Sequence, residues 1–118
     1  MAFRFKGFKI YDEIRLYVSE LYQVANSLPK DELFGLNSQL KRASSSILLN
    51  LAEGSMKGSD GEFRRFILIS IGSVSEVVAI LDICLDQKYI KASTHEKCML
   101  KSELIAKRLY AFKKSLEH

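Results

Sequence analysis

The chain has 118 residues, with 18 Lys and Arg against 14 Asp and Glu, and a formal net charge of +4 at pH 7. This length supports one domain with one hydrophobic core. One proline and six glycines argue against a β-sandwich, a collagen-like chain and a disordered linker. The apolar runs are far shorter than the roughly 20 residues of a membrane span, and the N-terminus has no apolar signal segment.

The cysteine count favours a cytoplasmic protein. Cys84 and Cys98 are too few for a secreted disulfide framework. We expect two reduced, half-buried thiols, although a turn near Lys91 would also let the two face each other across a hairpin. Residues 1–115 are expected to form the single domain. Residues 116–118 resemble the start of a C-terminal affinity tag, so we assign them no function.

The first two helices are predicted over residues 10–27 and 37–53. In both, apolar residues recur every three or four positions, which gives one stripe for packing against a neighbouring helix. Pro29 ends the first helix because it lacks an amide donor. Asn37 or the serine after it can serve as N-cap of the second helix. Gly54 would end that helix in the left-handed conformation that glycine adopts readily.

A glycine-rich loop over residues 54–61 precedes the third predicted helix, which continues to about Gln87. Ser59 and Glu62 have the spacing of a capping box, with Ser59 as N-cap. From residue 63 to residue 85, 15 of 23 residues are apolar. A helix that is apolar most of the way round is buried on more than one side. In a domain this small, we expect another subunit to supply the second burial.

The fourth helix is predicted over residues 93–115, where Ser93 and Glu96 repeat the capping-box spacing. Four helices with short connections favour an all-α fold. The expected architecture is an antiparallel up-down-up-down four-helix bundle.

A polar stripe follows the second predicted helix beside its apolar stripe. Two interpretations are compatible with it: a solvated face, or a packed seam of hydrogen bonds. In a buried seam Arg42 needs a carboxylate partner, which Glu76 of the same chain or Glu53 of another chain would provide. Gly72 and Ser73 would permit close approach of the third helix. The stripe falls within about 80° of the helix circumference and consists of Gln39, Arg42, Ser46, Asn50 and Glu53.

The centre of the chain carries a recognisable pattern. Residues 39–43 (QLKRA), 46–47 (SI) and 50–54 (NLAEG) resemble the signature QLRRA..SI..NIAEG of the bacterial four-helix bundle proteins encoded in 23S rRNA intervening sequences. The resemblance spans roughly residues 9–110. It extends upstream to residues 28–32 and 35–36, and downstream to Phe63, Phe66, Gly72, Ser73 and Glu76. The chain departs from the family pattern at Lys41, Ser44, Ser45 and Ile71.

The resemblance implies a bundle that assembles as a ring-like homopentamer. The family also includes the accessory variability determinant of diversity-generating retroelements, whose members bind nucleic acid and a reverse transcriptase. The intervening-sequence members have no settled activity, so no catalytic residue is transferred. The resemblance marks signature and interface positions at Gln39, Arg42, Ser46, Asn50, Glu53, Gly54, Ser73 and Glu76.

No catalytic, metal or cofactor site is predicted from the residues. His95 and Glu96 are adjacent, so their side chains diverge on a helix and do not form a metal pair. Cys98 lies three residues after His95 but lacks an orienting third group and an oxyanion site. The protein is therefore expected not to be an enzyme.

Basic residues, concentrated near both chain ends, are the remaining functional signal. They form either a solvated cationic surface or a field that attracts a polyanion, strengthened when several copies pool their charge. We predict a non-enzymatic oligomeric accessory protein that binds RNA or DNA. The alternative is a scaffold that docks a protein partner, such as a reverse transcriptase, without touching nucleic acid. The predicted nucleic-acid-binding residues are Lys41, Lys57, Arg64, Arg65, Lys101, Lys107 and Arg108.

Overall fold

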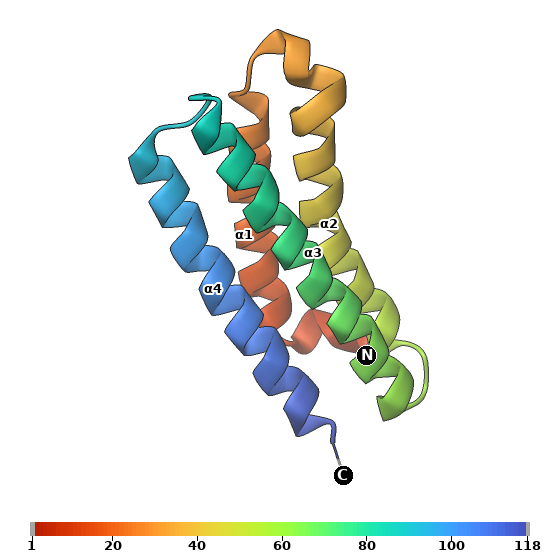
Figure 1. The fold of residues 1–118 in the computed structure, drawn as a ribbon. Coiled ribbons are helices and arrows are strands. Elements are labelled where there is room, and N and C mark those ends of the chain that lie inside the picture. Colours follow the sequence, from red (N-terminus) through yellow and green to blue (C-terminus); the bar gives the residue numbers. More distant parts are fainter. Residues whose placement is uncertain (1, 118) are drawn as a thin grey trace.

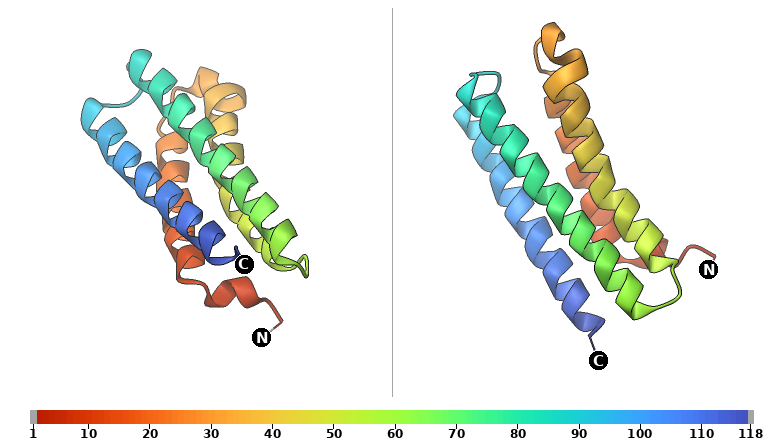
Figure 2. Two further views of the ribbon diagram at one scale, coloured as in Figure 1. Left: turned by 60° about the horizontal axis from the view of Figure 1, so that its bottom comes forward. Right: turned by 45° about the vertical axis from the view of Figure 1, so that its right-hand side comes forward.

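The computed structural model describes residues 2–117, which form four long helices and no strand. The helices lie side by side in a bundle of 45 × 23 × 20 Å (Figures 1 and 2). This confirms the predicted all-α class and the number of helices. The helices are α1 (Lys9–Asn26), α2 (Ser38–Ser55), α3 (Asp60–Asp86) and α4 (Ala92–Ser115).

Two ion pairs show the relative direction of α1 and α4. On α1 and α4, Glu13 pairs with Arg108 at 2.8 Å and Glu20 pairs with Lys101 at 3.7 Å. The two helices therefore run in opposite directions. The start of α1, the α2–α3 loop and the end of α4 meet at one end of the bundle, and the α1–α2 and α3–α4 connections lie at the other (Figure 1).

The two predicted capping boxes have different outcomes. The Ser59 hydroxyl accepts a hydrogen bond from the Glu62 amide at 3.2 Å, which confirms Ser59 as the N-cap of α3. The prediction for Ser93 is wrong, because α4 already begins at Ala92 and Lys91 occupies the N-cap position without a side-chain bond. A tight turn precedes α4, and within it Lys88 takes a left-handed conformation with φ of 62°.

Gly54 does not end α2, contrary to the prediction. The helix continues to Ser55, and Gly54 is buried within it. A Cβ at this position would lie 2.5 Å from the Cβ of Phe66 and 3.1 Å from the Phe63 ring. Glycine is therefore needed here for the close approach of α2 to α3, not for chain reversal.

The α1–α2 connection holds Asn37 in a different role from the predicted one. Asn37 occupies the N-cap position of α2, but its side chain makes no capping bond. Instead its amide donates to the Ala25 carbonyl at 2.9 Å and ties the connection to the end of α1. The connection consists of a short 3-10 helix at Lys30–Glu32 and a π-helical turn at Leu33–Asn37.

α3 contributes more buried residues than any other helix, yet it is not covered on every side. Its inner positions, such as Phe63, Ile67 and Leu81, are fully buried in the core. Its outer positions Leu68 and Ile83 remain 48% and 45% exposed. One chain therefore leaves the second side of α3 open, and burial of that side by another subunit stays a prediction.

Among residues 2–117, α3 is the one helix long and apolar enough to cross a membrane, judged by length and composition. Half of its apolar window is buried inside the bundle, and a core helix of a soluble protein passes the same test. Its two acidic side chains there bind neighbouring helices, Glu76 through Arg42 and Asp82 through His95.

Both chain ends fold against the bundle. A short 3-10 helix at Arg4–Gly7 precedes α1. At the C-terminal end of the chain, Leu116 packs against the core, and its carbonyl accepts a hydrogen bond from Arg64. Of the three residues predicted to be a tag remnant, His118 lies outside the described residues.

A buried hydrogen bond joins α1 and α4 inside the core. The Tyr17 and Ser102 hydroxyls lie 2.6 Å apart, and the Ser102 hydroxyl donates its one hydrogen to the Cys98 carbonyl at 2.7 Å. Burial raises the pKa of Tyr17 to about 12. Cys84 and Cys98 are both buried and free, and burial raises the pKa of each thiol.

Tyr17 should make stability fall at high pH. Because its folded pKa lies above the ordinary value of 10.0, the neutral phenol stabilises the fold below pH 10. That contribution is lost as the pH rises toward 12. We expect the free energy of unfolding to fall by about 1.4 kcal/mol per pH unit in this range relative to Tyr17→Phe. Denaturant titrations of both proteins at pH 9 and pH 11 measure the difference, and parallel pH curves would contradict it.

Gly54→Ala tests the close approach of α2 to α3. We expect a loss of about 1–3 kcal/mol in the free energy of unfolding, because the added methyl group overlaps Phe66. Gly61→Ala is the matched control. A Cβ at Gly61, in the first turn of α3, meets only Arg64 at 3.8 Å, so the change should be neutral or stabilise by up to about 1 kcal/mol. Equal effects of the two substitutions in urea unfolding would refute this account of Gly54.

Candidate functional site

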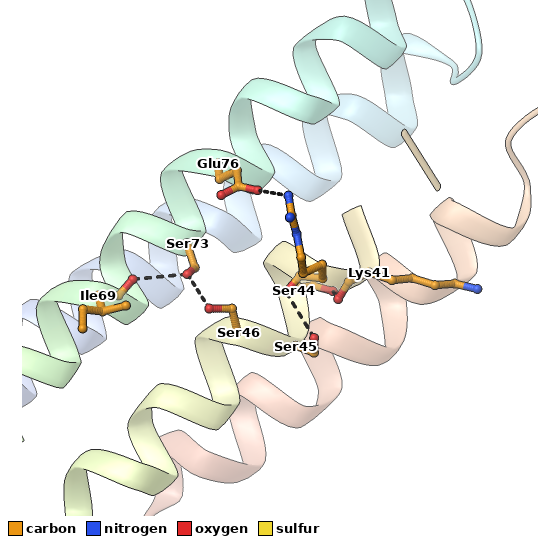
Figure 3. A network of polar contacts seen from close by, with 8 residues as sticks. Lys41, Ser44, Ser45, Ser46, Ile69, Ser73 and Glu76 are labelled. Carbon is orange, nitrogen blue, oxygen red and sulfur yellow. Dashed lines mark hydrogen bonds and ion pairs between the residues drawn. The ribbon is translucent and has the colours of Figure 1, made fainter. Parts of the chain in front are cut away.

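Signature residues meet in a polar seam between α2 and α3, which we define as Arg42, Ser46, Asn50, Ser73 and Glu76. The Asn50 amide donates to the Ser46 hydroxyl at 3.0 Å, and the Ser46 and Ser73 hydroxyls lie 2.9 Å apart. Ser73 in turn donates to the Ile69 carbonyl at 3.2 Å (Figure 3). The hydrogen bonds thus run in one direction, from Asn50 through both serines to the backbone of α3. These short side chains let the two helices lie close together.

Arg42 and Glu76 form the outer edge of the polar seam. Their Nη2 and Oε2 atoms lie 3.6 Å apart, which confirms Glu76 as the partner of Arg42 within the chain (Figure 3). The side chains are 74% and 49% exposed. An ion pair this exposed contributes about 0–1 kcal/mol. Within one chain the seam is therefore part packed and part solvated, and it matches neither of the two predicted interpretations fully.

The remaining signature residues lie around this seam. Gln39 is exposed on α2. Glu53, one of the two carboxylates considered for Arg42, instead pairs with Lys57 at 3.7 Å. Gly72 does not serve a close helix contact within the chain, because a Cβ there would meet no atom within 4 Å.

An exposed row of residues runs along α3 and shares Glu76 with the polar seam. Its members recur every three or four positions, so they share one face of the helix. A glycine in the middle of a helix lowers helix stability by about 1 kcal/mol relative to alanine. Because the space around Gly72 is open, no contact within one chain requires a glycine at this position. We call this row the outer α3 stripe: Ile69, Gly72, Glu76, Ala79 and Ile83.

Positive charge is concentrated at one end of the bundle, where residues 2–13, 53–65 and 107–117 meet (Figure 1). We call this the basic end. It holds six acidic residues against ten basic ones, whereas the rest of the chain holds eight of each. The whole net charge of +4 therefore lies at this end. The ten basic residues are Arg4, Lys6, Lys9, Lys57, Arg64, Arg65, Lys107, Arg108, Lys113 and Lys114.

Five of the seven predicted nucleic-acid-binding residues lie at the basic end, and two do not. Lys41 lies on α2, with its ammonium 5.5 Å from the centre of the Tyr22 ring. Lys101 lies in the middle of α4, where it pairs with Glu20. The five at the basic end are Lys57, Arg64, Arg65, Lys107 and Arg108.

Most of these five cations already have a partner. Lys57, Arg65 and Arg108 pair with carboxylates of the chain, and Arg64 binds the Leu116 carbonyl. The hydrogen bond and charge of Arg65 lower the pKa of Glu62. Within residues 2–117, Lys107 is the one of the five without a polar or ionic contact.

Sequence reasoning left three exposed lysines of the basic end out of the binding set. Lys6, Lys9 and Lys114 are exposed and make no ion pair within the described part of the chain. Their position near the two chain ends was the available signal, because both ends reach the same end of the bundle. With Lys107 they make four free lysines.

An aromatic cluster underlies the basic end. The rings of Phe8, Phe63 and Phe112 lie 5.1–6.2 Å from one another. The Arg4 guanidinium lies 5.6 Å from the centre of the Phe8 ring and 5.7 Å from that of Phe63. This packing fixes the N-terminal segment beside the ends of α3 and α4.

His95 has a structural partner. Its Nε2 atom lies 2.8 Å from an Asp82 carboxylate oxygen, which ties the first turns of α4 to α3. In residues 2–117 no three His, Cys, Asp or Glu side chains are grouped closely enough to hold a metal ion.

Comparison with known proteins identifies the family. Residues 6–111 match the sequence profile of the 23S rRNA-intervening sequence protein. The chain belongs to this family. The predicted resemblance to this family is thereby confirmed.

A solved structure shares the fold of this 23S rRNA-intervening sequence protein. It is a protein of unknown function from the S23 ribosomal protein family of Bacteroides thetaiotaomicron VPI-5482. The two chains are 21% identical and superpose with a TM-score of 0.82, over 89% of this chain and 98% of that chain. No curated protein sequence matches the chain.

The Arg42–Glu76 pair of this intervening sequence protein should be weak within one chain. In a double-mutant cycle with Arg42→Ala and Glu76→Ala, we expect a coupling energy of about 0.2–1 kcal/mol that decreases in 1 M salt. Urea unfolding at protein concentrations where sedimentation shows single chains measures it. Coupling above about 2 kcal/mol would contradict the exposed geometry.

Proposed function

We propose that this protein is a non-enzymatic, homo-oligomeric accessory protein of the cytoplasm that binds RNA or DNA through its basic end. The location of the whole net charge at one end of the bundle carries this proposal. The four free lysines Lys6, Lys9, Lys107 and Lys114 supply the contacts.

Free lysines suit phosphate binding better than paired ones. A cation already held by a carboxylate must give up that contact, or share it, before it neutralises a phosphate. A free lysine loses only water and releases condensed counterions from the nucleic acid. Binding is therefore tolerant of sequence and strongly dependent on salt, because phosphate contacts carry no base information.

The charge of the basic end comes from side chains rather than from helix dipoles. The N-terminal ends of α1 and α3 and the C-terminal ends of α2 and α4 lie there together (Figure 1). Their partial charges have opposite signs and largely cancel. Substitution of lysines should therefore alter binding without any change in the fold.

Assembly is the second part of the proposal. The up-down-up-down bundles associate through the outer α3 stripe and form a ring, with the pentamer of the family as the expected size. The exposed Ile69 and Ile83, and Gly72 with its open surroundings, support a protein neighbour on this face. Lipid is a poor alternative, because Glu76 and Asp82 lie in the same apolar part of α3 and a charge in lipid costs several kcal/mol.

A protein partner such as a reverse transcriptase is the second candidate. The observation that favours it is the ion pairing of Lys57, Arg65 and Arg108 within the chain. A surface of mixed, paired charges suits a partner with its own mixed charges, whereas a polyanion needs net positive charge.

Charge reversal at the basic end tests nucleic-acid binding. We expect Lys107→Glu with Lys114→Glu to weaken binding of a labelled RNA or DNA oligonucleotide by more than about tenfold, because phosphate contacts are lost. The matched control is Lys88→Glu with Lys91→Glu, which makes the same charge change at the other end and should cost much less. Fluorescence anisotropy at 50 and 200 mM salt measures both.

Two outcomes would contradict nucleic-acid binding. One is an absence of binding by the wild-type protein at low salt. The other is an equal loss of affinity in both double variants, which would indicate a response to total charge rather than a site at the basic end. A partner protein that stays bound after nuclease treatment, together with either outcome, would favour the scaffold.

A further inference from the structure

A pocket lies between the start of α1 and the end of α4, which meet at the basic end of the bundle (Figure 1). We call it the α1–α4 pocket. Its volume is about 460 Å³, within the range of roughly 300–1,000 Å³ that is typical of small-ligand pockets. Both helices contribute to its lining, with Phe8 and Ile10 on the α1 side and Ala111 and Phe112 on the α4 side. The pocket shares no residue with the outer α3 stripe, the face proposed for assembly.

Aromatic rings form part of the wall of this pocket. The ring centres of Phe8 and Phe112 lie 5.1 Å apart, and both residues are only half-buried. The fully buried Phe63 ring lies 5.5 Å from that of Phe112 and holds it in place. Beside the rings, the small side chain of Ala111 leaves the pocket open. An accessible aromatic surface that is fixed in this way suits a planar group stacked against it.

One border of the α1–α4 pocket is polar. Glu13 and Arg108 both line it, and the Oε2 atom of Glu13 lies 2.8 Å from the Nε atom of Arg108. A ligand at this border therefore meets a carboxylate acceptor and guanidinium donors side by side. The edge of a nucleobase carries donors and acceptors side by side as well, whereas a lipid chain carries neither.

Three of the four free lysines surround the pocket. Lys9 is part of its lining. On α4, Lys107 lies four residues before Ala111 and Lys114 lies three residues after it. Residues at this spacing share one face of a helix, so the two lysines lie one turn to either side of Ala111. A ligand in the pocket thus has free ammonium groups around it.

These three features together select one class of ligand. The free lysines favour negative charge, the aromatic wall favours a planar group, and the polar border favours donors and acceptors along the edge of that group. A nucleic-acid strand carries phosphates and planar bases in alternation, so a single ligand satisfies all three. In a duplex the bases are paired and stacked, and their extrusion costs pairing and stacking energy. A single strand presents its bases without the pairing cost.

We infer that the α1–α4 pocket receives an unpaired base of single-stranded RNA or DNA, while Lys9, Lys107 and Lys114 bind the phosphates that flank this base. The inference rests on the proposed nucleic-acid binding and names the form of nucleic acid that the basic end prefers. Every base has a planar face, so stacking in the pocket is compatible with any sequence.

The strand form of the ligand gives a test with opposite expectations. Phosphate contacts alone favour a duplex, because its charge density is higher than that of a single strand. The base pocket reverses this order. We expect the wild-type protein to bind a labelled single strand more tightly than the same strand annealed to its complement, by about tenfold or more, in fluorescence anisotropy at low salt. A duplex that binds equally well or better would overturn the inference.

An abasic strand isolates the contribution of the base. A strand of the same length with abasic sites in place of its nucleosides keeps every phosphate but has no base to insert. We expect its affinity for the wild-type protein to be lower by about tenfold or more than that of the normal strand. Equal affinities of the two strands would show that phosphates alone are recognised.

Filling the pocket tests its location. In Ala111→Leu the larger side chain occupies the space beside the rings, and the helix content by circular dichroism should be unchanged because Ala111 is exposed. We expect this variant to lose most of the preference for the single strand. The matched control is Ala92→Leu, at an exposed alanine that begins α4 at the other end of the bundle, and it should keep the preference. A preference that persists in Ala111→Leu, or that both variants lose equally, would contradict the assignment to this pocket.

Failure of the base pocket is distinguishable from failure of the proposed function. If the wild-type protein binds duplex and abasic strands as tightly as the single strand, the inference is wrong while nucleic-acid binding through phosphates stands. If it binds none of them at low salt, nucleic-acid binding fails and the base pocket fails with it.

Discussion

The close packing of α2 against α3 is the constraint on which the rest of the structure depends. Gly54 admits Phe66, and the Ser70 hydroxyl donates to the Ile47 carbonyl at 2.8 Å across the same contact. Small residues let the backbones of α2 and α3 approach each other, but this packing covers only the inner side of α3. The apolar residues on the other side of that helix remain at the surface. The same contact thus explains both the stable hairpin of α2 and α3 and the apolar face that one chain leaves uncovered.

The fold was largely predictable from the sequence because helical periodicity is a local signal. The stripes of apolar residues located all four helices to within a few residues, and Ser59 was recognisable as an N-cap. The errors arose where tertiary contacts decide. Ser93 has the spacing of a capping residue, but the turn before α4 ends earlier. Gly54 looks like a helix terminator until the position of Phe66 is known.

The site was less predictable, since it depends on which charges meet. Glu76 was one of two carboxylates expected to pair with Arg42, the other being Glu53 of another chain, yet the exposure of the Arg42–Glu76 pair could not be read from spacing. The sequence likewise shows how many lysines and arginines there are, but not which of them carboxylates hold. Lys107 is free and its neighbour Arg108 is paired with Glu13, although the two are adjacent in the sequence.

The concentration of charge at one end of the bundle limits the length of nucleic acid that one subunit can neutralise. The cross-section of the bundle is 23 × 20 Å, and duplex DNA carries one negative charge per roughly 1.7 Å of its axis. A duplex lying across that cross-section would therefore present roughly a dozen phosphates to a net charge of +4. A lone subunit would leave most of that anionic stretch unneutralised, and only several subunits standing together could balance it.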